Sequence, residues 1–443
     1  MKVLKFGGTS VGSAERMGKV AKIITDDEQP KIIVLSAVSG TTNSLVEIGA
    51  FWRQGTTQKL NDLVEKLYAH YSKFINDLLG NTDNYQNALA VIDQHFRKIR
   101  LLVTLSFNQS SNKELLAQGE LISTHLFSLF LKENNIQAKL IPALDFMRID
   151  AEGEPDLPYL REQLSLQIDE GERLFITQGF ICKNHSGEID NLKRGGSDYT
   201  ASLIGAAISA KEVQIWTDID GMHNNDPRIV PDTFPIEALS FDEAAELAYF
   251  GAKILHPNTI WPAQQGNIPV KLLNTMEPEA KGTTISSVKN PGSIKAIAAK
   301  DGITAIKIKS SRMLLAYGFL RKIFEIFEQY KVPIDMITTS EVAVSLTIDT
   351  DDHLDLLKDA LEEYGEVAVD KDLTIVCVVG DLIAEQKGMV NNVFGCTADQ
   401  PIRMISYGGS RNNISLLVPT EAKQEVLLAL NRGLFSRTSV SKI

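Results

Sequence analysis

The start of the chain constrains the fold most, because it places a glycine turn and then a helix between two apolar strand patterns. Residues 2–6 (KVLKF) alternate as a strand does, and the glycine turn follows them. Ser13 is placed to cap a helix that runs to about Thr25, and Glu15 suits the first turn of that helix. Residues 31–35 (KIIVL) form the next expected strand. This order predicts a right-handed β-α-β unit whose ligands bind at the carboxyl ends of the strands.

The next part of the chain changes from strand–helix alternation to helices alone. Between residues 43 and 133, apolar residues recur at helical spacing without a good strand pattern, so we expect a helical insertion there. Alternation then resumes, with strand patterns at 173–177, 213–217 and 269–273. These elements predict an α/β domain over residues 1–285, built as an αβα sandwich around a mostly parallel sheet.

The last third of the chain has a different pattern. Residues 294–443 contain two blocks of about 70 residues, each of which reads approximately as β-α-β-β-α-β. This predicts an internal duplication of a ferredoxin-like α+β unit within residues 286–443. The first unit is expected at about 302–370 and the second at 371–443.

Charge and cysteine content exclude several classes of protein. The chain has 45 basic and 56 acidic residues, a net charge of -11, and no long basic run, which argues against nucleic acid as the main partner. Its 3 cysteines are far apart and form no C-x-x-C, so neither a disulfide framework nor a zinc site is indicated. No signal-peptide core appears, and no stretch approaches the ~20 apolar residues of a membrane span. We therefore expect a cytoplasmic protein that binds no membrane.

The first candidate for chemistry is Lys5, which precedes the glycine pair Gly7 and Gly8. Phosphoryl transfer needs backbone N–H donors near the migrating oxygens and a cation for the developing charge, and this turn and lysine can supply them. The glycine spacing up to Gly12 is that of a Walker A loop, but Ser13 stands where that motif has lysine, which disfavours a P-loop enzyme. A surface lysine beside an ordinary tight turn is the alternative.

A second glycine turn, Arg194-Gly195-Gly196-Ser197-Asp198, opens a predicted helix. Arginine binds a carboxylate or phosphate through two hydrogen bonds, and the start of a helix favours anions. Plain helix capping is the alternative, because Ser and Asp are common caps. The pairing of the two turns favours a ligand site, since one carries a lysine, the other an acid, and both follow core strands of one sheet.

Two further segments carry polar residues in less specific patterns. Residues 215–230 run from a strand into a polar loop that suits a nucleotide, and a long surface connection is an equal alternative. Glu120 lies in a predicted helix, where its carboxylate either holds the ammonium group of a substrate or is simply exposed. The sequence shows neither a nucleophile–histidine–acid arrangement nor an H-E-x-x-H motif.

Taken together and in this order, the motifs resemble those of the aspartokinases. The matching segments cover nearly the whole chain and include KFGGTSVGS (5–13), LSAVSGTTN (35–43), QGELIS (118–123), KRGGSDYTA (193–201), WTDIDG (216–221), DPRIV (226–230), FGAKILHP (250–257) and ITTSEVAVSLT (337–347). The resemblance is strongest to the monofunctional, lysine-sensitive type. It implies transfer of the γ-phosphoryl group of ATP to the β-carboxylate of L-aspartate, which gives 4-phospho-L-aspartate in the first step of lysine, threonine and methionine biosynthesis.

The resemblance also implies a role for individual residues. Lys5 would stabilise the transferred group, assisted by the amides of Gly7 and Gly8, and Asp198 would orient Lys5. The contacts to aspartate would come from Ser36, Thr42, Glu120, Arg194 and Ser197. The contacts to ATP would come from Thr217, Asp218, His223, Arg228 and Lys253, with Mg²⁺ held mainly by the ATP phosphates and no separate metal site in the protein. The family often has an aromatic residue where this chain has His223, which leaves the stacking contact with the nucleotide open.

The duplicated tail resembles the tandem ACT domains of this family, which bind an end-product amino acid. The family arrangement assigns residues 293–300 to the second ACT domain, together with 371–443. The residues of this chain that resemble the effector pocket of the lysine-sensitive type are Met313, Gly318, Phe319, Asp335, Thr339 and Ser340. Ala316 replaces a serine of that pattern. We expect lysine as the effector and a homodimer formed through the ACT domains.

Two other classes of protein share part of these motifs. Sister amino acid kinases that act on glutamate, acetylglutamate, carbamate or uridylate share the Lys-x-Gly-Gly turn, but the duplicated tail argues against them. A non-catalytic amino-acid sensor would keep the ACT domains and lose catalytic residues, whereas Lys5, Arg194 and Asp198 are all present.

Overall fold

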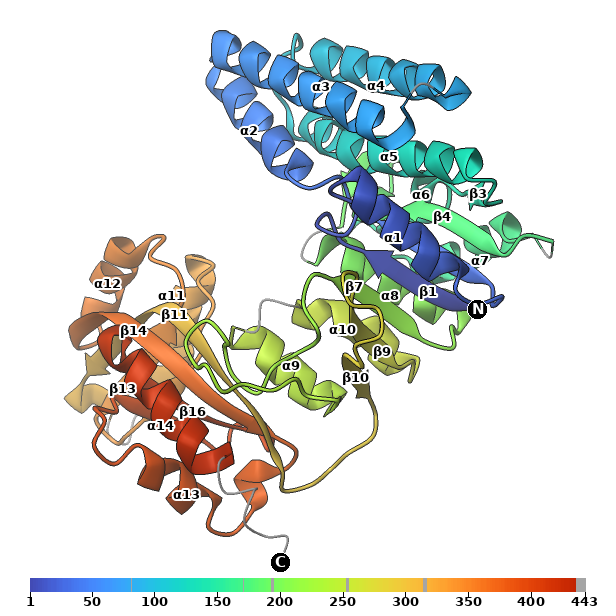
Figure 1. Cartoon of the computed structure of the whole chain (residues 1–443). Coiled ribbons are helices and arrows are strands. Elements are labelled where there is room, and N and C mark those ends of the chain that lie inside the picture. The colour runs from blue at the N-terminus through green and yellow to red at the C-terminus, as the bar shows by residue number, and fades with distance from the viewer. Residues whose placement is uncertain (81, 170, 193–194, 252–254, 314–316, 436–443) are drawn as a thin grey trace, which may run out of the picture. The chain divides into compact units, whose positions relative to one another are not determined.

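The computed structural model describes residues 1–443 except 81, 170, 193–194, 252–254, 314–316 and 436–443 (Figure 1). The chain divides into two compact units. The first unit comprises Met1–Met222 and Leu255–Ser287, and the second comprises His223–Ile254 and Val288–Ile443. Within the described residues, no helix has the length and apolar character needed to cross a membrane.

The first unit alternates strands and helices around a block of four long helices. Its elements are β1 (Lys2–Phe6), α1 (Ala14–Thr25), β2 (Lys31–Leu35), α2 (Thr41–Gln54), α3 (Thr57–Leu79), α4 (Asp83–Leu102), α5 (Gln109–Glu133), β3 (Lys139–Leu140), α6 (Ala143–Phe146), α7 (Leu157–Gln167), β4 (Leu174–Gln178), β5 (Ile181–Lys183), β6 (Ile189–Asn191), α8 (Gly196–Ile208), β7 (Val213–Thr217), α10 (Pro257–Gln265), β9 (Val270–Asn274) and β10 (Thr283–Ser286). Helices α2–α5 form the expected helical insertion, stacked at one end of this unit (Figure 1).

The sheet of the first unit is mostly parallel, as the sequence predicts. Its strands follow the order β3-β4-β2-β1-β7-β9-β10. Strand β1 pairs in parallel with β2 on one side and with β7 on the other, and only β10 runs antiparallel to its neighbour β9. The first strand of the chain therefore lies inside the sheet, and its carboxyl end lies beside those of β2 and β7.

Alternation along β1 directs its side chains to opposite faces of the sheet. Leu4 and Phe6 are buried in a core that the sheet shares with α1 and the helical insertion. Lys5 points to the other face, where α8 packs against β1, β2 and β7. A shift of β1 by one residue would therefore turn Lys5 into the core and Leu4 and Phe6 toward α8.

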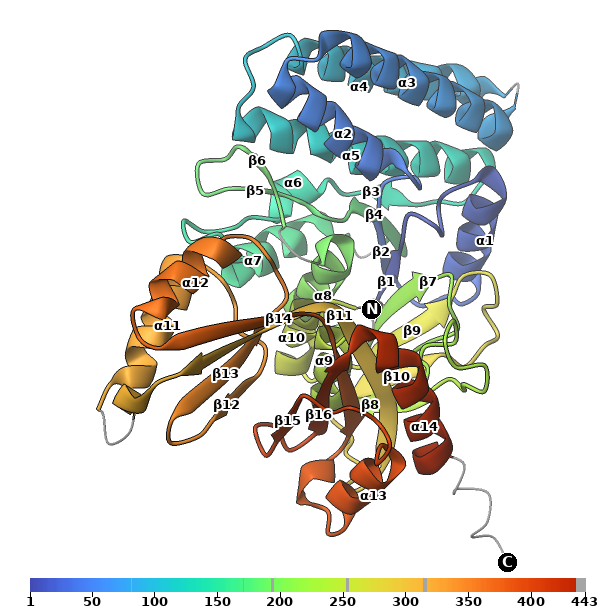
Figure 2. The same cartoon turned by 90° about the vertical axis from the view of Figure 1, so that its left-hand side faces the viewer.

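The second unit is built on an antiparallel sheet. Its elements are β8 (Ala238–Ser240), α9 (Phe241–Tyr249), β11 (Ile294–Lys309), α11 (Phe319–Gln329), β12 (Ile337–Thr339), β13 (Ala343–Ile348), α12 (Leu354–Glu362), β14 (Glu366–Gly380), α13 (Met389–Cys396), β15 (Met404–Tyr407), β16 (Asn413–Pro419) and α14 (Lys423–Phe435). The strand order is β12-β13-β11-β14-β16-β15. Figure 2 shows α11 and α12 at one part of this sheet and α13 and α14 at the other.

The duplication seen in the sequence appears as two modules with separate cores. The first module buries Ile308, Ile323 and Leu346 among its core residues, and the second buries Val378, Leu416 and Val426. The long strands β11 and β14 pair along both modules, so residues 294–300 and 303–309 belong to one strand. The two modules thus share a continuous sheet.

Helix α9 belongs to the second unit and packs against β11 and β14. Its start is fixed by a capping box: the Glu243 N–H donates to Ser240 Oγ (3.2 Å), and the Ser240 N–H donates to Glu243 Oε2 (2.7 Å). Each bond satisfies an N–H that the first helical turn leaves without a partner.

Candidate active site

The carboxyl end of β1 brings a lysine and an acid together. Lys5 Nζ lies 2.6 Å from Asp198 Oδ1, and the two side chains are only 11% and 17% exposed. Asp198 stands in the first turn of α8, where a negative charge is favourable. The lysine therefore has a fixed position at the strand ends and is not a freely exposed surface charge.

The glycine turn after β1 lies close to the loop that follows β2. The Gly7 N–H donates to the carbonyl oxygen of Trp216, at the end of β7 (3.3 Å). A Cβ on Gly8 would lie 2.9 Å from the carbonyl oxygen of Ala37, a distance that real Cβ atoms do not show. Any side chain at position 8 would push the two loops apart.

The loop after β2 also meets the start of α8. Ser36 Oγ donates a hydrogen bond to Ser197 Oγ (2.9 Å). A Cβ on Gly179, just after β4, would lie 2.3 Å from Ser197 Cβ, so only glycine allows this approach. The ends of β1, β2 and β4 and the start of α8 therefore converge on one polar region.

Glu120 adds a buried carboxylate next to this region. It lies on α5 and is only 3% exposed, so the alternative of an exposed helical glutamate is wrong. Its Oε1 accepts the Ala37 N–H (3.2 Å), and its Oε2 has no hydrogen-bond partner among the described residues. Burial raises the pKa of Glu120 from 4.5 to about 8. A buried carboxylate with an unused oxygen is suited to bind a cationic group.

The other predicted contacts to aspartate are less clearly placed. Thr42 is exposed in the first turn of α2. Arg194 lies outside the described residues, so its role stays a prediction.

The predicted contacts to ATP fall in both units. Thr217 ends β7 and Asp218 follows it, and Thr217 Oγ1 donates to Asp218 Oδ1 (3.2 Å). In the second unit, His223 Nδ1 lies 3.0 Å from Thr233 Oγ1, and the exposed Arg228 is 2.7 Å from Asp226. Lys253 lies outside the described residues. These assignments stay predictions.

Sequence reasoning missed a buried hydrogen bond between two helices of the insertion, α2 and α3. Tyr71 of α3 is fully buried, and its hydroxyl lies 2.8 Å from Thr41 Oγ1, at the start of α2. Burial is the main cause that raises the pKa of Tyr71, so the hydroxyl stays neutral. Its spacing among apolar residues indicated only a core position.

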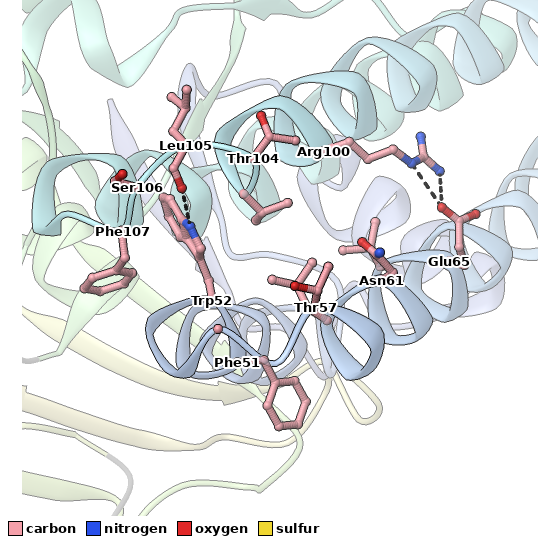
Figure 3. A pocket seen from close by; sticks show the side chains of 14 residues that line it. Phe51, Trp52, Thr57, Asn61, Glu65, Arg100, Thr104, Leu105, Ser106 and Phe107 are labelled. Carbon is pink, nitrogen blue, oxygen red and sulfur yellow. Dashed lines mark hydrogen bonds and ion pairs between the residues drawn. The ribbon is translucent and has the colours of Figure 1, made fainter.

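A cavity of about 590 Å³ lies within the helical insertion (Figure 3). Trp52 Nε1 donates to the carbonyl oxygen of Leu105 (2.9 Å) at one side, and Arg100 is paired with Glu65 (2.8 Å) at the other. The lining contains aromatic residues such as Phe107, but none of the predicted substrate residues. This cavity is therefore separate from the polar region at the strand ends.

The predicted effector residues are distributed over the first module. Met313 and Phe319 pack in or against its core, Gly318 precedes α11, and Thr339 and Ser340 lie at the end of β12. Asp335 instead lines a second cavity, of about 580 Å³, which α9 and residues near β12 and β15 enclose. This carboxylate has only 2% of its side chain exposed.

Comparison with known proteins places this arrangement of strand ends in a class of kinases. Residues 1–274 match the model of the amino acid kinase family, and residues 376–434 match a model of the ACT domain. The fold is thus that of an amino acid kinase, followed by an ACT domain.

Relatives that match over nearly their full length identify the family within this class of kinases. Lysine-sensitive aspartokinase 3 of Escherichia coli is 36% identical over 452 residues, which cover 98% of this chain and 99% of the relative. Two structures of E. coli aspartokinase III, one with aspartate and ADP and one with lysine and aspartate, match 98% of this chain at 35% identity, with TM-scores of 0.86 and 0.81. The match covers 100% of the chain in the first of these structures and 99% in the second. The aspartate kinase of Clostridium acetobutylicum matches with 26% identity and a TM-score of 0.83, over 98% of this chain and 100% of its own. The chain belongs to the aspartokinase family.

Proposed function

We propose that this chain is an ATP-dependent aspartate kinase that forms 4-phospho-L-aspartate, the first step of lysine, threonine and methionine biosynthesis. The observation that carries the proposal is the Lys5–Asp198 pair, 2.6 Å apart at the end of β1, with the buried and half-unpaired Glu120 nearby on α5. One cation is thus available for a phosphoryl group and one anion for an ammonium group. The membership of the family and the match to a structure with aspartate and ADP support the same reaction.

Aspartate would be held through its backbone groups. Its ammonium group would bind Oε2 of Glu120, which then gains the partner that no described residue provides. Its α-carboxylate would bind Arg194 through two hydrogen bonds. The hydroxyls of Ser36, Ser197 and Thr42 would contact the remaining polar atoms. This leaves the β-carboxylate free to react.

The reaction is a direct displacement at phosphorus. An oxygen of the β-carboxylate forms a bond to the γ-phosphorus, while the bond from that phosphorus to the β-phosphate oxygen of the leaving ADP breaks. The carboxylate is ionised at neutral pH, so no general base is needed. Lys5 would stabilise the charge that develops on the transferred group, and Asp198 would hold Lys5 in place. Gly7 and Gly8 carry no side chains, so their turn leaves room for a phosphoryl group to approach Lys5.

ATP would be bound by Thr217, Asp218, His223, Arg228 and Lys253. Bound to the ATP phosphates, Mg²⁺ would neutralise part of their charge. The described residues contain no group of three or more His, Cys, Asp or Glu side chains arranged to hold a metal ion. As the family resemblance implies, the Mg²⁺ ligands would come mainly from the phosphates.

An assay with alternative acceptors tests the proposed reaction. Aspartate, glutamate and uridylate are offered with ATP, and ADP release is measured with a coupled enzyme system. We expect turnover with aspartate alone. Turnover with glutamate or uridylate in preference to aspartate would assign the chain to a sister kinase.

We also propose that lysine inhibits the enzyme through the first module of the second unit. One relative matched over 99% of its length is a lysine-sensitive aspartokinase, and one matched structure contains lysine. The effector residues would be Met313, Gly318, Phe319, Asp335, Thr339 and Ser340. The activity is measured with millimolar lysine, threonine and methionine. Inhibition by lysine that Asp335→Ala abolishes supports the site, whereas unchanged inhibition in that variant rejects it.

Two further properties remain predictions. A homodimer formed through the ACT domains is expected from the family resemblance, and sedimentation of the purified chain measures it. A cytoplasmic location is expected as well, and fractionation of the source cells tests it.

A further inference from the structure

Helix α9 is tied to both modules of the second unit by polar contacts. At its end, the Tyr249 hydroxyl donates to Asp335 Oδ1 of the first module (2.6 Å). One turn earlier, Glu246 accepts hydrogen bonds from Ser410 Oγ and Asn413 Nδ2 of the second module, each of 2.5 Å. These contacts line the cavity of about 580 Å³ described above. Both modules therefore hold the same short helix.

The two oxygens of Asp335 are used unequally. Oδ1 accepts from Tyr249 and also from Lys300 Nζ (2.9 Å), while Oδ2 is buried and has no hydrogen-bond partner among the described residues. Lys300 also pairs with Asp349 (2.9 Å) and lies 4.6 Å from the centre of the Tyr249 ring. A buried oxygen without a partner is unfavourable, so a ligand that donates to it gains binding energy.

We infer that Asp335 is a bridge between the amino-acid effector and helix α9: the effector's ammonium group binds Oδ2, while Oδ1 keeps hold of Tyr249. This inference rests on the proposed function, because it takes the effector site at Asp335 from there. With Oδ2 occupied, the carboxylate is fixed in orientation, so that Oδ1 stays aligned with the Tyr249 hydroxyl. Effector binding thereby changes how firmly the regulatory sheet holds α9, which is the difference between states that an inhibitor needs.

The chain itself leads from α9 to the catalytic turn of the first unit. Tyr249 ends α9, and a short segment that contains Lys253 connects it to α10. Thr259 of α10 packs on the glycine turn before α8, with its Cγ2 only 2.2 Å from the place of a Cβ on Gly195. This is the turn that precedes Ser197 and Asp198. The chain thus connects α9 directly to segments that the proposed function assigns to ATP and to Lys5.

The test separates effector binding from inhibition. In Tyr249→Phe, calorimetry with lysine should give a dissociation constant within about threefold of the wild type, because Oδ2 is untouched. The lysine concentration for half inhibition should rise by about fivefold or more, since the removed hydrogen bond ends on a charged group. The activity without lysine should stay within about twofold. Glu246→Gln should weaken inhibition in the same direction, because it loosens the second tie of α9.

Tyr407→Phe is the matched control. Tyr407 lines the same cavity and is 47% exposed, close to the 42% of Tyr249, but its hydroxyl donates to the carbonyl oxygen of Ala384 (2.5 Å) and not to Asp335. Its inhibition by lysine should equal that of the wild type. If the wild type is inhibited and Tyr249→Phe is inhibited equally, the bridge is rejected and the proposed regulation stands. If lysine, threonine and methionine all fail to inhibit the wild type, the proposed regulation and the bridge both fall.

Discussion

Glu120 in the first unit and Asp335 in the second are both buried carboxylates, yet the chain surrounds them differently. Glu120 receives one backbone N–H and, among the described residues, no cation. Asp335 receives the ammonium group of Lys300 and the hydroxyl of Tyr249. Each retains one oxygen without a partner. The described residues thus leave the Glu120 carboxyl group without any counter-charge, whereas at Asp335 they leave only one oxygen without a partner.

This difference separates two uses of a buried acid. A carboxylate without a cation is held protonated by its burial until a cationic ligand arrives, so it suits the binding of a substrate. A carboxylate that is already paired keeps its partners in place, and a ligand can only add to them. The first arrangement selects a ligand, and the second transmits its presence. The following changes test this distinction.

The largest effect is expected from Lys5→Ala, because the kinase unit depends on a cation that acts mainly in the transition state. We expect kcat to fall on the order of 10² to 10³-fold with an unchanged circular dichroism spectrum. Lys19→Ala is the control, since this half-buried lysine of α1 contacts Glu15 (3.3 Å) and Met276 Sδ (3.6 Å). A Lys5→Ala variant that keeps more than about a tenth of the wild-type kcat would contradict the assignment.

The next largest effect is expected from Glu120→Gln, which keeps the shape of the side chain and the bond from Ala37. The KM for aspartate should rise about thirtyfold or more, since loss of one member of a buried charge pair costs about 2 kcal/mol or more. The KM for ATP should change less than about twofold. An equal rise in both KM values would show that Glu120 supports the site as a whole and does not bind the ammonium group.

The pKa of Glu120 gives the first unit a pH dependence. Because burial raises this pKa to about 8, the free enzyme must lose a proton before Glu120 can bind an ammonium group. The KM for aspartate should therefore fall by about tenfold as the pH rises from about 7 to about 9. Glu120→Gln should remove this dependence. A KM for aspartate that is constant over this range in the wild type would contradict the prediction.

The same pKa affects folding, with a sign opposite to that of an ion-paired acid. The folded chain binds this proton more tightly than the unfolded chain, whose pKa is near 4.5. The contribution to stability is therefore complete below about pH 4.5 and is lost as the pH rises towards about 8. Urea unfolding should show Glu120→Gln gaining stability relative to the wild type across this window. A constant difference between the two proteins would indicate an ordinary pKa.

The smallest effect is expected from Lys300→Met in the second unit. Breaking the contact with the buried Asp335 should lower the free energy of unfolding by about 1 to 2 kcal/mol, a reduced value because 19% of the Lys300 side chain is exposed. The KM for aspartate should be unchanged. This is the reverse of Glu120→Gln, which changes binding. A large rise in the KM for aspartate would erase the distinction between the two acids.

The sequence predicts the strand ends well, because their signals are local. A lysine on an apolar strand, a glycine pair and a helix cap each occur within a few residues, and together they predicted the parallel sheet and the family resemblance. The paired position of Lys5 and Asp198 followed from the family resemblance, since 193 residues separate them in the chain. The helical insertion could be predicted equally well, because the spacing of apolar residues alone defines it.

What the sequence could not predict depends on packing between distant segments. The burial of Glu120 comes from the contact of α5 with the loop after β2, and nothing in QGELIS distinguishes it from an exposed helix. The hairpin of β5 and β6 is only 3 residues long in each strand, too short for a clear alternation. The association of α9 with the second unit is likewise invisible in the chain order, since α9 lies between strands of the first unit.

The shared strands β11 and β14 determine where this protein can be cut. Residues 294–300 pair with the second half of β14, and 303–309 pair with its first half. A fragment that starts at residue 371 would lose the partner of Ile375–Val379 and present an unpaired, apolar strand edge, which invites aggregation. A regulatory fragment therefore has to start before Ile294. Although each module has its own core, the two should be transferred to another protein, or released by a protease, only as one piece.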